Sequence, residues 1–379
     1  MSESGRFALM ANPGSRRALG FFTACRTRGL AEPVLIPWEE WLSPGYDRAT
    51  ALDGIDFLRI ETPAESDAVE RRLLTRGAAA CELEGLYPFL PESKCAALPA
   101  DEGELRHQRQ WYLGWEAVLG DLAVRCESLR LRPMNSPGEI AVLFDKLATR
   151  VVLEPRGVSV PPTLGICRNF DDLLGRMETA GWQRVFLKPC HGSSASGVMA
   201  IARNSRGNWL ATTSAVAVQT PAGCRIHNSK RLRRLTDLKE IRRTVDAVCR
   251  ERALAERWFP KATLDGKSFD LRVLVIAGRA AHVAVRTSSS PVTNLHLHNR
   301  RGGVGDVIGA LGSATWSKVM ENAADAARAF PGCHYTGVDL MIGAGGRKQA
   351  VAEVNAFGDL LHHETWHGLD PWEAELSLW

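Results

Sequence analysis

The sequence lacks the features that mark membrane-spanning and disulfide-stabilised proteins. No uninterrupted apolar run is long enough to cross a bilayer. The nine cysteines are dispersed, no Cys-x-x-Cys pair occurs, and no secretory signal is recognisable. An odd, scattered set of cysteines is typical of reduced thiols. We therefore expect a cytoplasmic protein that makes no membrane contact.

Strong positive charge is also missing, because the formal net charge is only +4. The most basic stretch, residues 225–234, contains no aromatic residue between its arginines. It therefore offers neither a phosphate track nor a base-stacking platform, and we expect no nucleic-acid partner. A solvated helix face is the favoured interpretation of this stretch, ahead of binding to nucleic acid or to an acidic peptide.

The length of 379 residues and the hydrophobic content of 45% are sufficient for more than one core, which favours two to three domains. Residues 1–135 alternate between expected strands and helices, as a small parallel-sheet α/β domain does. The expected strands are residues 7–10, 33–36 and 57–60, and the expected helices are residues 18–28, 66–80 and 106–126. No internal repeat is present.

Residues 337–342 and 351–355 have the pattern of a β-hairpin, with the Gly-rich segment 343–347 as its turn. Residues two apart share a face of a strand, so Glu353 and Asn355 point the same way, and the turn brings Asp339 opposite Glu353. Two carboxylates and an amide oxygen suit Mg²⁺, which keeps its other positions for water and phosphate. A hairpin with a solvated polar edge is the alternative.

The segment from Lys188 to Val198 is a small-residue loop between two expected strands. Its Gly and Ser residues allow backbone N–H groups to approach phosphate oxygens, and Lys188 adds a positive charge. The Walker A spacing is absent, and a turn without a ligand is the alternative interpretation.

Charged residues also lie within two expected apolar strands, 269–276 and 281–286. These residues are Asp270, Arg272 and Arg286, and buried charges of this kind need partners. Upstream, residues 136–150 are expected to form a helix that carries Lys146.

Taken together, Lys146, Lys188 with its Gly/Ser loop, the Asp-x-Arg strand, Asp339 and the Glu-x-Asn motif resemble the ATP-grasp superfamily. The resemblance covers about residues 137–360 and is greatest to the glutathione synthetase and ribosomal-protein glutamate ligase branch. It implies an α/β fold with an N-terminal parallel-sheet domain (1–135) and two α+β lobes (136–255 and 256–379) that enclose a nucleotide.

The resemblance also implies roles for individual residues. Lys146 and Lys188 would contact ATP phosphates, Glu256 the adenine amino group and Asp270 the ribose. The remaining nucleotide contacts implied are His191, Gly192, Ser193, Ser194 and Gly197 in the loop, with the backbone near Trp258 and Phe259. Asp339, Glu353 and Asn355 would bind one or two Mg²⁺ ions. The catalytic set implied is Arg272 and Arg286, which would hold the transferring phosphoryl group or the carboxylate, with Asn299 and Arg301 from a loop that closes the site.

The activity implied is an ATP- and Mg²⁺-dependent ligase that joins a carboxylate to an amine through an acyl phosphate. Both substrates would be small molecules, with a peptide as an open alternative. A kinase that phosphorylates a hydroxyl and a nucleotide-binding module without chemistry stay open as other functions. The sequence identifies neither substrate, and it leaves the oligomeric state open, including a homodimer.

Three histidines near the C-terminus, His362, His363 and His367, have no cysteine nearby and no carboxylate at metal-binding spacing. We expect them to line a substrate site or to pack as neutral rings, and we do not expect zinc. The sequence Ala356-Phe357-Gly358 follows Asn355 where many relatives have a Pro-Gly or Ser-Pro turn, so the acceptor is undetermined.

Overall fold

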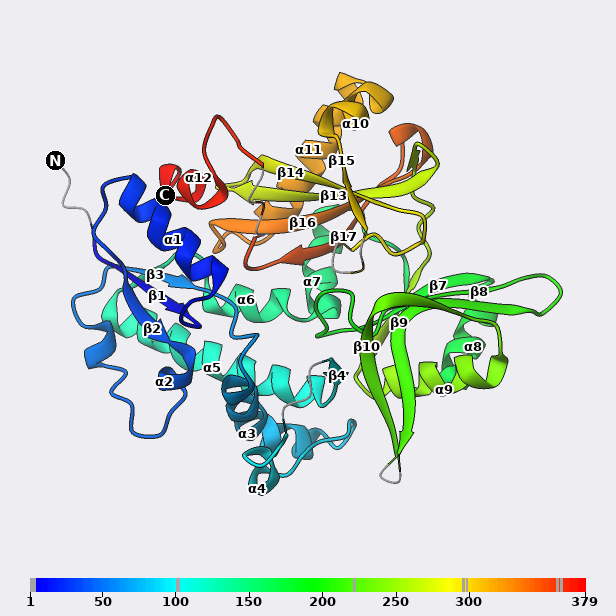
Figure 1. Cartoon of the computed structure of the whole chain (residues 1–379), viewed down its shortest axis with the longest axis horizontal. Helices are drawn as coiled ribbons and strands as arrows, with labels where there is room; N and C mark the ends of the chain where they lie inside the picture. The colour runs from blue at the N-terminus through cyan, green and yellow to red at the C-terminus, as the bar shows by residue number, and fades with distance from the viewer. Residues whose placement is uncertain are drawn as a thin grey trace.

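The protein was analysed as a computed structural model, which describes residues 5–99, 103–220, 223–294, 297, 299–358, 361 and 364–379. It contains one parallel sheet and two antiparallel sheets (Figure 1). This arrangement confirms the mixed α/β fold class. Among the helices in the described ranges, none is long and apolar enough to cross a membrane.

The first sheet is parallel and has the strand order β2-β1-β3-β5. Its strands are β1 (Phe7–Ala11), β2 (Val34–Pro37), β3 (Phe57–Ile60) and β5 (Arg132–Pro133). The accompanying helices are α1 (Arg16–Thr27), α2 (Trp38–Trp41), α3 (Asp67–Glu84), α4 (Glu92–Cys95) and α5 (Gln108–Leu129). The three strands and three helices predicted for residues 1–135 are all present. Helix α3 begins where the Ser66 side chain accepts a hydrogen bond from the Val69 N–H, as an N-cap does.

The second sheet is antiparallel, with the order β4-β10-β9-β8-β7-β11-β6. Its strands are β4 (Glu104–Leu105), β6 (Thr163–Cys167), β7 (Arg184–Pro189), β8 (Met199–Arg203), β9 (Trp209–Thr220), β10 (Gly223–Leu235) and β11 (Ala253–Arg257). Helices α8 (Phe170–Thr179) and α9 (Leu238–Cys249) pack on this sheet and enclose a separate hydrophobic core. The β9–β10 hairpin extends away from the body (Figure 1).

The third sheet is antiparallel and has the order β15-β14-β13-β16-β17, with β12 paired to β13. Its strands are β12 (Thr263–Leu264), β13 (Lys267–Ile276), β14 (Arg279–Ser288), β15 (Arg300–Gly302), β16 (Tyr335–Ile342) and β17 (Gln349–Asn355). The helices α10 (Val304–Leu311), α11 (Ser313–Arg328) and α12 (Pro371–Ser377) belong to this part of the chain. Helix α12 is capped by Asp370, which forms a capping box with Glu373.

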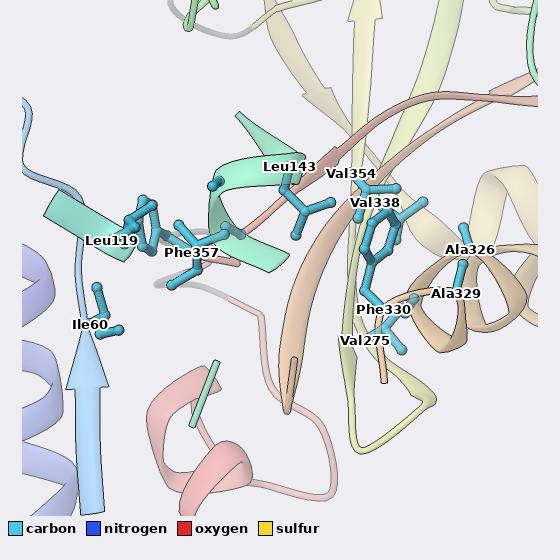
Figure 2. Close-up of a cluster of buried hydrophobic side chains, with 14 of the residues drawn as sticks. Ile60, Leu119, Leu143, Val275, Ala326, Ala329, Phe330, Val338, Val354 and Phe357 are labelled. Carbon is cyan, nitrogen blue, oxygen red and sulfur yellow. The ribbon is translucent and has the colours of Figure 1, made fainter. Parts of the chain in front are cut away.

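The first and third sheets contribute side chains to the same hydrophobic clusters, whereas the second sheet has its own core. Ile60 of β3, Leu119 of α5, Val338 of β16 and Phe330 belong to a single cluster (Figure 2). Whether the chain divides into domains at residues 135 and 255 stays a prediction.

Two expected elements differ in the structure. The helix predicted over 136–150 is two helices, α6 (Pro137–Leu143) and α7 (Lys146–Leu153), because the Asp145 side chain accepts hydrogen bonds from two N–H groups and starts a new helix. The basic stretch 225–234, predicted as a helix face, is part of strand β10. Pairing with β9 decides its conformation, and a register shift between Asn228 and Arg233 obscures the alternation expected of a strand.

Replacing Gly77 by Ala is expected to lower the free energy of unfolding by about 1–3 kcal/mol. Helices α3 and α5 cross at Gly77 and Gly114, and a Cβ atom on Gly77 would lie 1.9 Å from the backbone oxygen of Gln110. The helices would have to separate. Chemical denaturation should show this loss, whereas Gly120→Ala on the exposed side of α5, where nothing lies within 4 Å, should be neutral or slightly stabilising. Equal effects of the two substitutions would contradict the close crossing.

Candidate nucleotide and metal site

The predicted hairpin of β16 and β17 is present, and its register aligns Asp339 with Glu353 and Gly337 with Asn355. The predicted pairing of the two carboxylates is therefore confirmed. The Asn355 amide nitrogen donates to the Gly337 carbonyl over 3.1 Å, so its amide oxygen is the atom left to face a ligand. The three oxygen-bearing side chains all line the same cavity.

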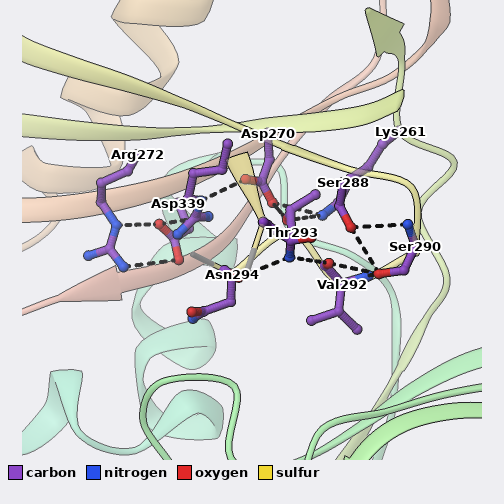
Figure 3. Close-up of polar contacts among 11 residues, drawn as sticks. Lys261, Asp270, Arg272, Ser288, Ser290, Val292, Thr293, Asn294 and Asp339 are labelled. Carbon is purple, nitrogen blue, oxygen red and sulfur yellow. Dashed lines mark hydrogen bonds and ion pairs between the residues drawn. The ribbon is translucent and has the colours of Figure 1, made fainter. Parts of the chain in front are cut away.

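Two arginines from β13 and β14 hold Asp339. The Arg272 Nε atom lies 2.6 Å from Asp339 Oδ1, and a terminal nitrogen of Arg286 lies 3.1 Å from the same oxygen. Figure 3 shows Arg272 directed at the Asp339 carboxylate. Because both arginines are fixed before any ligand binds, little reorganisation is needed when negative charge enters the site.

Asp270 connects Arg286 to a lysine that the sequence analysis missed. Its Oδ1 atom lies 2.8 Å from Arg286 Nε, and its Oδ2 atom lies 2.7 Å from Lys261 Nζ and accepts a hydrogen bond from Thr293 (Figure 3). Burial acts to raise the pKa of Asp270, but Arg286 and Lys261 outweigh it and hold this pKa well below its ordinary value. Both carboxylate oxygens thus have cationic partners.

The two predicted phosphate-binding lysines make ion pairs with acids of the same site. Lys146 Nζ lies 3.1 Å from Glu353 Oε1, and Lys188 Nζ lies 2.8 Å from Glu256 Oε2. Lys188 also donates to the Ala352 carbonyl over 3.2 Å, so it links the second sheet to β17 of the third. Burial acts to raise the pKa of Glu353, but Lys146 and Lys188 outweigh this effect, so its pKa is lowered.

The loop after β7 covers one side of the cavity. Ser194 and Ala195 have φ values of 54° and 58°, in the left-handed region that is costly for residues other than glycine. Gly197 has a φ of 71°, which glycine adopts freely. This conformation directs the loop across the site, where Gly192 and Ser193 line the cavity together with Ser194.

His191 belongs to the same loop but packs away from the cavity. Its ring stacks on Tyr112 of α5 with centroids 4.0 Å apart, and its Nδ1 atom lies 3.2 Å from the Phe144 carbonyl. Burial is the main cause that lowers the pKa of His191 to about 3, with help from Arg252 and against the effect of Asp145. The side chain is therefore a neutral packing group at neutral pH.

Mild acid is expected to destabilise the fold through His191. Its folded pKa of about 3 is below the ordinary 6.5, so below about pH 6.5 the unfolded chain binds a proton that the folded chain does not. The free energy of unfolding should therefore fall as the pH falls from about 6.5 toward 3. Urea denaturation at several pH values should show a flatter profile for His191→Phe, which keeps a stacked ring. The exposed His367→Gln variant is the control, and an unchanged slope in His191→Phe would contradict this assignment.

The cavity lies between the second and third sheets and has a volume of about 160 Å³. It gathers most of the residues that the sequence predicted for the site. The predicted residues that line it are Lys146, Lys188, Gly192, Ser193, Ser194, Glu256, Phe259, Asp270, Arg272, Arg286, Asp339, Glu353 and Asn355. The predicted residues outside this lining are His191, Gly197, Trp258, Asn299 and Arg301.

Two of the outlying residues have structural contacts instead. The Asn299 side chain donates to the carbonyls of Val292 and Asn294 over 2.8 and 2.9 Å, so it braces the loop whose residues 291–294 line the cavity. Arg301 lies on β15, 3.4 Å from Glu364. His362 and His363 lie outside the described residues.

Lys261 and Thr293 line the cavity but were not predicted. Lys261 lies in the segment before β12, and Thr293 lies in the loop after β14. Neither has a periodic pattern or a motif around it. Lys261 reaches Asp270 from nine positions earlier in the chain, and Thr293 reaches it from 23 positions later. No local sequence pattern reveals either contact.

The donor set of the hairpin fits Mg²⁺. Within the described ranges, no group of three or more His, Cys, Asp or Glu residues could hold a metal. The set here has only two carboxylates, Asp339 and Glu353, with the amide oxygen of Asn355. Asp339 Oδ1 is buried and accepts no hydrogen bond of good geometry within the described residues, although Arg272 and Arg286 lie near it. Such a set can hold a hard cation whose other ligands are phosphate and water.

Residues 146–334 match the family model described as YheC/D like ATP-grasp. No curated protein matches the chain. A structure of the ATP-grasp ligase PsnB, complexed with a phosphomimetic variant of its minimal precursor, Mg and ADP, is 16% identical, with a TM-score of 0.53 over 99% of this chain and 97% of that chain.

Two further solved structures share the fold. D-alanine–D-alanine ligase from Bacillus anthracis is 12% identical, with a TM-score of 0.53 over 98% of this chain and 92% of that chain. The D-cycloserine synthetase DcsG is 13% identical, with a TM-score of 0.54 over 98% of this chain and 99% of that chain. At these identities the likeness establishes the fold alone, and the predicted branch within the superfamily stays a prediction. The family match and the shared fold together show that the chain belongs to the ATP-grasp superfamily.

Proposed function

We propose that the protein is an ATP-dependent ligase that joins a carboxylate to an amine in an ADP-forming reaction. The observation that carries this proposal is a cavity in which the Asp/Glu/Asn hairpin converges with Lys146, Lys188, Arg272 and Arg286. Phosphoryl transfer requires positioning and charge stabilisation rather than a protein nucleophile, and this arrangement supplies both.

Each step of the reaction has a group suited to it. Lys146 and Lys188 would exchange their carboxylate partners for ATP phosphates, since phosphate binds an ammonium group in the same way. The substrate carboxylate oxygen would attack the γ-phosphorus, the bond to the β-phosphate oxygen would break, and ADP would leave. Mg²⁺ bound by the hairpin residues would neutralise phosphate charge in this step.

The second step replaces phosphate by the amine. The amine nitrogen would attack the acyl carbon, lose a proton, and expel inorganic phosphate to leave an amide. Arg286 would stabilise the oxyanion, and its contacts with Asp270 and Asp339, which fix its guanidinium from two sides, support this role. The contacts of Asp270 support a role in positioning Arg286, in addition to or instead of the predicted ribose contact.

Water must be kept away from an acyl phosphate, which hydrolyses readily. The loop from Gly192 to Ser196 lines the cavity and is the group suited to close over it. The separate core of the second sheet supports such closure, because this sheet can approach the third without disturbing the shared core.

The test is ADP release with ATP and Mg²⁺ in the presence of pooled amino acids, small carboxylates and peptides, with products followed by mass spectrometry. A product with the mass of two substrates minus water would establish the ligase and identify both partners. A mass gain of one phosphate on a hydroxyl substrate would assign a kinase instead. Tight ATP binding without turnover in any pool would favour a nucleotide-binding module.

The proposal extends to the location of the protein and to the classes of its substrates. All nine cysteines are free, and most are buried, which supports a reducing compartment such as the cytoplasm. A solved structure of PsnB is complexed with a precursor peptide, and D-alanine–D-alanine ligase is named for small substrates, so both substrate classes belong in the assay.

A further inference from the structure

A second, larger cavity lies on the N-terminal part of the chain, between the segment after α2 and helices α3, α4 and α5. Its volume is about 760 Å³, and it shares no lining residue with the nucleotide cavity. We call it the arginine groove. The lining side chains on which the inference depends are Trp41, Arg48, Arg71, Arg72, Arg76 and Arg125.

Helix α3 presents one complete face to the arginine groove. The lining positions on α3 are 68, 71, 72, 75, 76 and 79, which recur at helical spacing. The other face of α3 is buried against the protein, with Val69 and Leu73 fully inaccessible. The groove face carries three arginines and no acid, whereas a solvated helix face usually mixes both signs of charge.

The guanidinium groups of the groove are only partly neutralised. Arg76 pairs with Asp121 of α5, and Arg71 donates to the Leu98 carbonyl over 3.2 Å. Across the part of the chain that the structure describes, Arg72 and Arg125 have no carboxylate partner. The groove lining contains five arginines but only two acids, Asp121 and Glu92. Asp121 already pairs with Arg76, so the lining carries an excess of positive charge.

Trp41 brings two of these cations together. The guanidinium carbons of Arg48 and Arg125 lie 5.7 and 5.9 Å from the centroid of its ring. The Trp41 side chain is buried, so it fixes both groups in position. Several cations held at one groove repel one another, and an anionic occupant would relieve that repulsion.

We propose that the arginine groove binds an acidic peptide segment in an extended conformation. Arg76 follows Arg72 by four positions on α3, a rise of about 6 Å along the helix. Side chains on one side of an extended peptide recur about every 6.5 Å. Asp or Glu residues at alternate positions can therefore reach successive arginines, and carboxylates accept paired hydrogen bonds from guanidinium groups. This function is independent of the proposed ligase activity.

Selection from a library of random heptapeptides tests the proposal with the full-length protein. Enriched peptides should carry Asp or Glu at alternating positions, and fluorescence anisotropy should show weaker binding at higher salt. The variant Arg72→Glu/Arg125→Glu should lose affinity by roughly tenfold or more. The matched control is Arg206→Glu/Arg347→Glu, which makes the same change in net charge at exposed arginines outside the groove and should bind as the wild type does.

The melting temperature and the affinity for ATP should be unchanged in the groove variant. If the charge reversal impairs folding, Arg72→Ala/Arg125→Ala replaces it in the binding assay. Absence of acidic residues among the enriched peptides would overturn the proposal. So would equal peptide affinity in the groove variant and the wild type. Tripolyphosphate or a single-stranded oligonucleotide that binds the groove more tightly than every selected peptide would assign it to that anion instead.

Discussion

ATP turnover is expected to fall by about 10²- to 10³-fold when Glu353 is replaced by Gln. The substitution keeps the shape of the side chain but removes a negatively charged oxygen ligand from the hairpin. It also removes the ion pair with Lys146, whose Nζ atom lies 3.1 Å from Glu353. Because Gln can still accept a hydrogen bond from Lys146, the fold should be retained. ADP release at increasing Mg²⁺ concentration measures the effect, and the concentration needed for half-maximal rate should rise.

Glu82→Gln is the control for this experiment, since Glu82 is exposed on α3 and far from the cavity lining. Its turnover should equal that of the wild type. Turnover within a few-fold of the wild type in Glu353→Gln, at every Mg²⁺ concentration, would exclude Glu353 as a metal ligand. Loss of the folded state in thermal melting would instead assign Glu353 a structural role through Lys146.

Replacement of Arg286 by Lys is expected to lower kcat by about 10²- to 10³-fold with a smaller change in KM for ATP. Lysine keeps the positive charge but cannot contact Asp270 and Asp339 at once, as the two ends of the guanidinium do at 2.8 and 3.1 Å. The cation would then no longer be held where negative charge develops. Steady-state kinetics with the substrates found by mass spectrometry provide the measurement.

Arg301→Lys is the matched comparison, because the sequence analysis placed both arginines in the catalytic set. Arg301 lies on β15 outside the cavity lining, near Glu364. Its substitution should change kcat by less than about threefold if the observed conformation is the active one. A loss as large as that of Arg286→Lys would show that the β15 segment moves into the site during the reaction.

Much of the site could be predicted because strand geometry is local. Alternation along β17 puts Glu353 and Asn355 on one face, and a short Gly-rich turn leaves little choice of register, so Asp339 was correctly placed opposite Glu353. The same reasoning located the β13–β14 hairpin that carries Asp270 and Arg286. Spacing along the chain then made the superfamily recognisable.

Local sequence patterns predicted the wrong secondary structure where long-range pairing decides the conformation. Residues 225–234 were interpreted as a helix face, but β9 recruits them into a strand. The helix expected over 136–150 breaks because Asp145 caps a second helix, although the apolar pattern around it continues without a break.

The strands, the turns and the candidate site residues on them follow from the sequence alone, because hydrophobic periodicity, turn residues and motif spacing act over short segments. Tertiary structure alone decided the partners of the charges. The contact of Lys146 with Glu353, that of Lys188 with Glu256 and the stacking of His191 on Tyr112 each join segments from different parts of the chain. The arginine groove likewise exists only because α2, α3, α4 and α5 pack around it. Such contacts depend on how sheets and helices pack in space, and pairwise electrostatics between distant residues leave no periodic signal in the sequence.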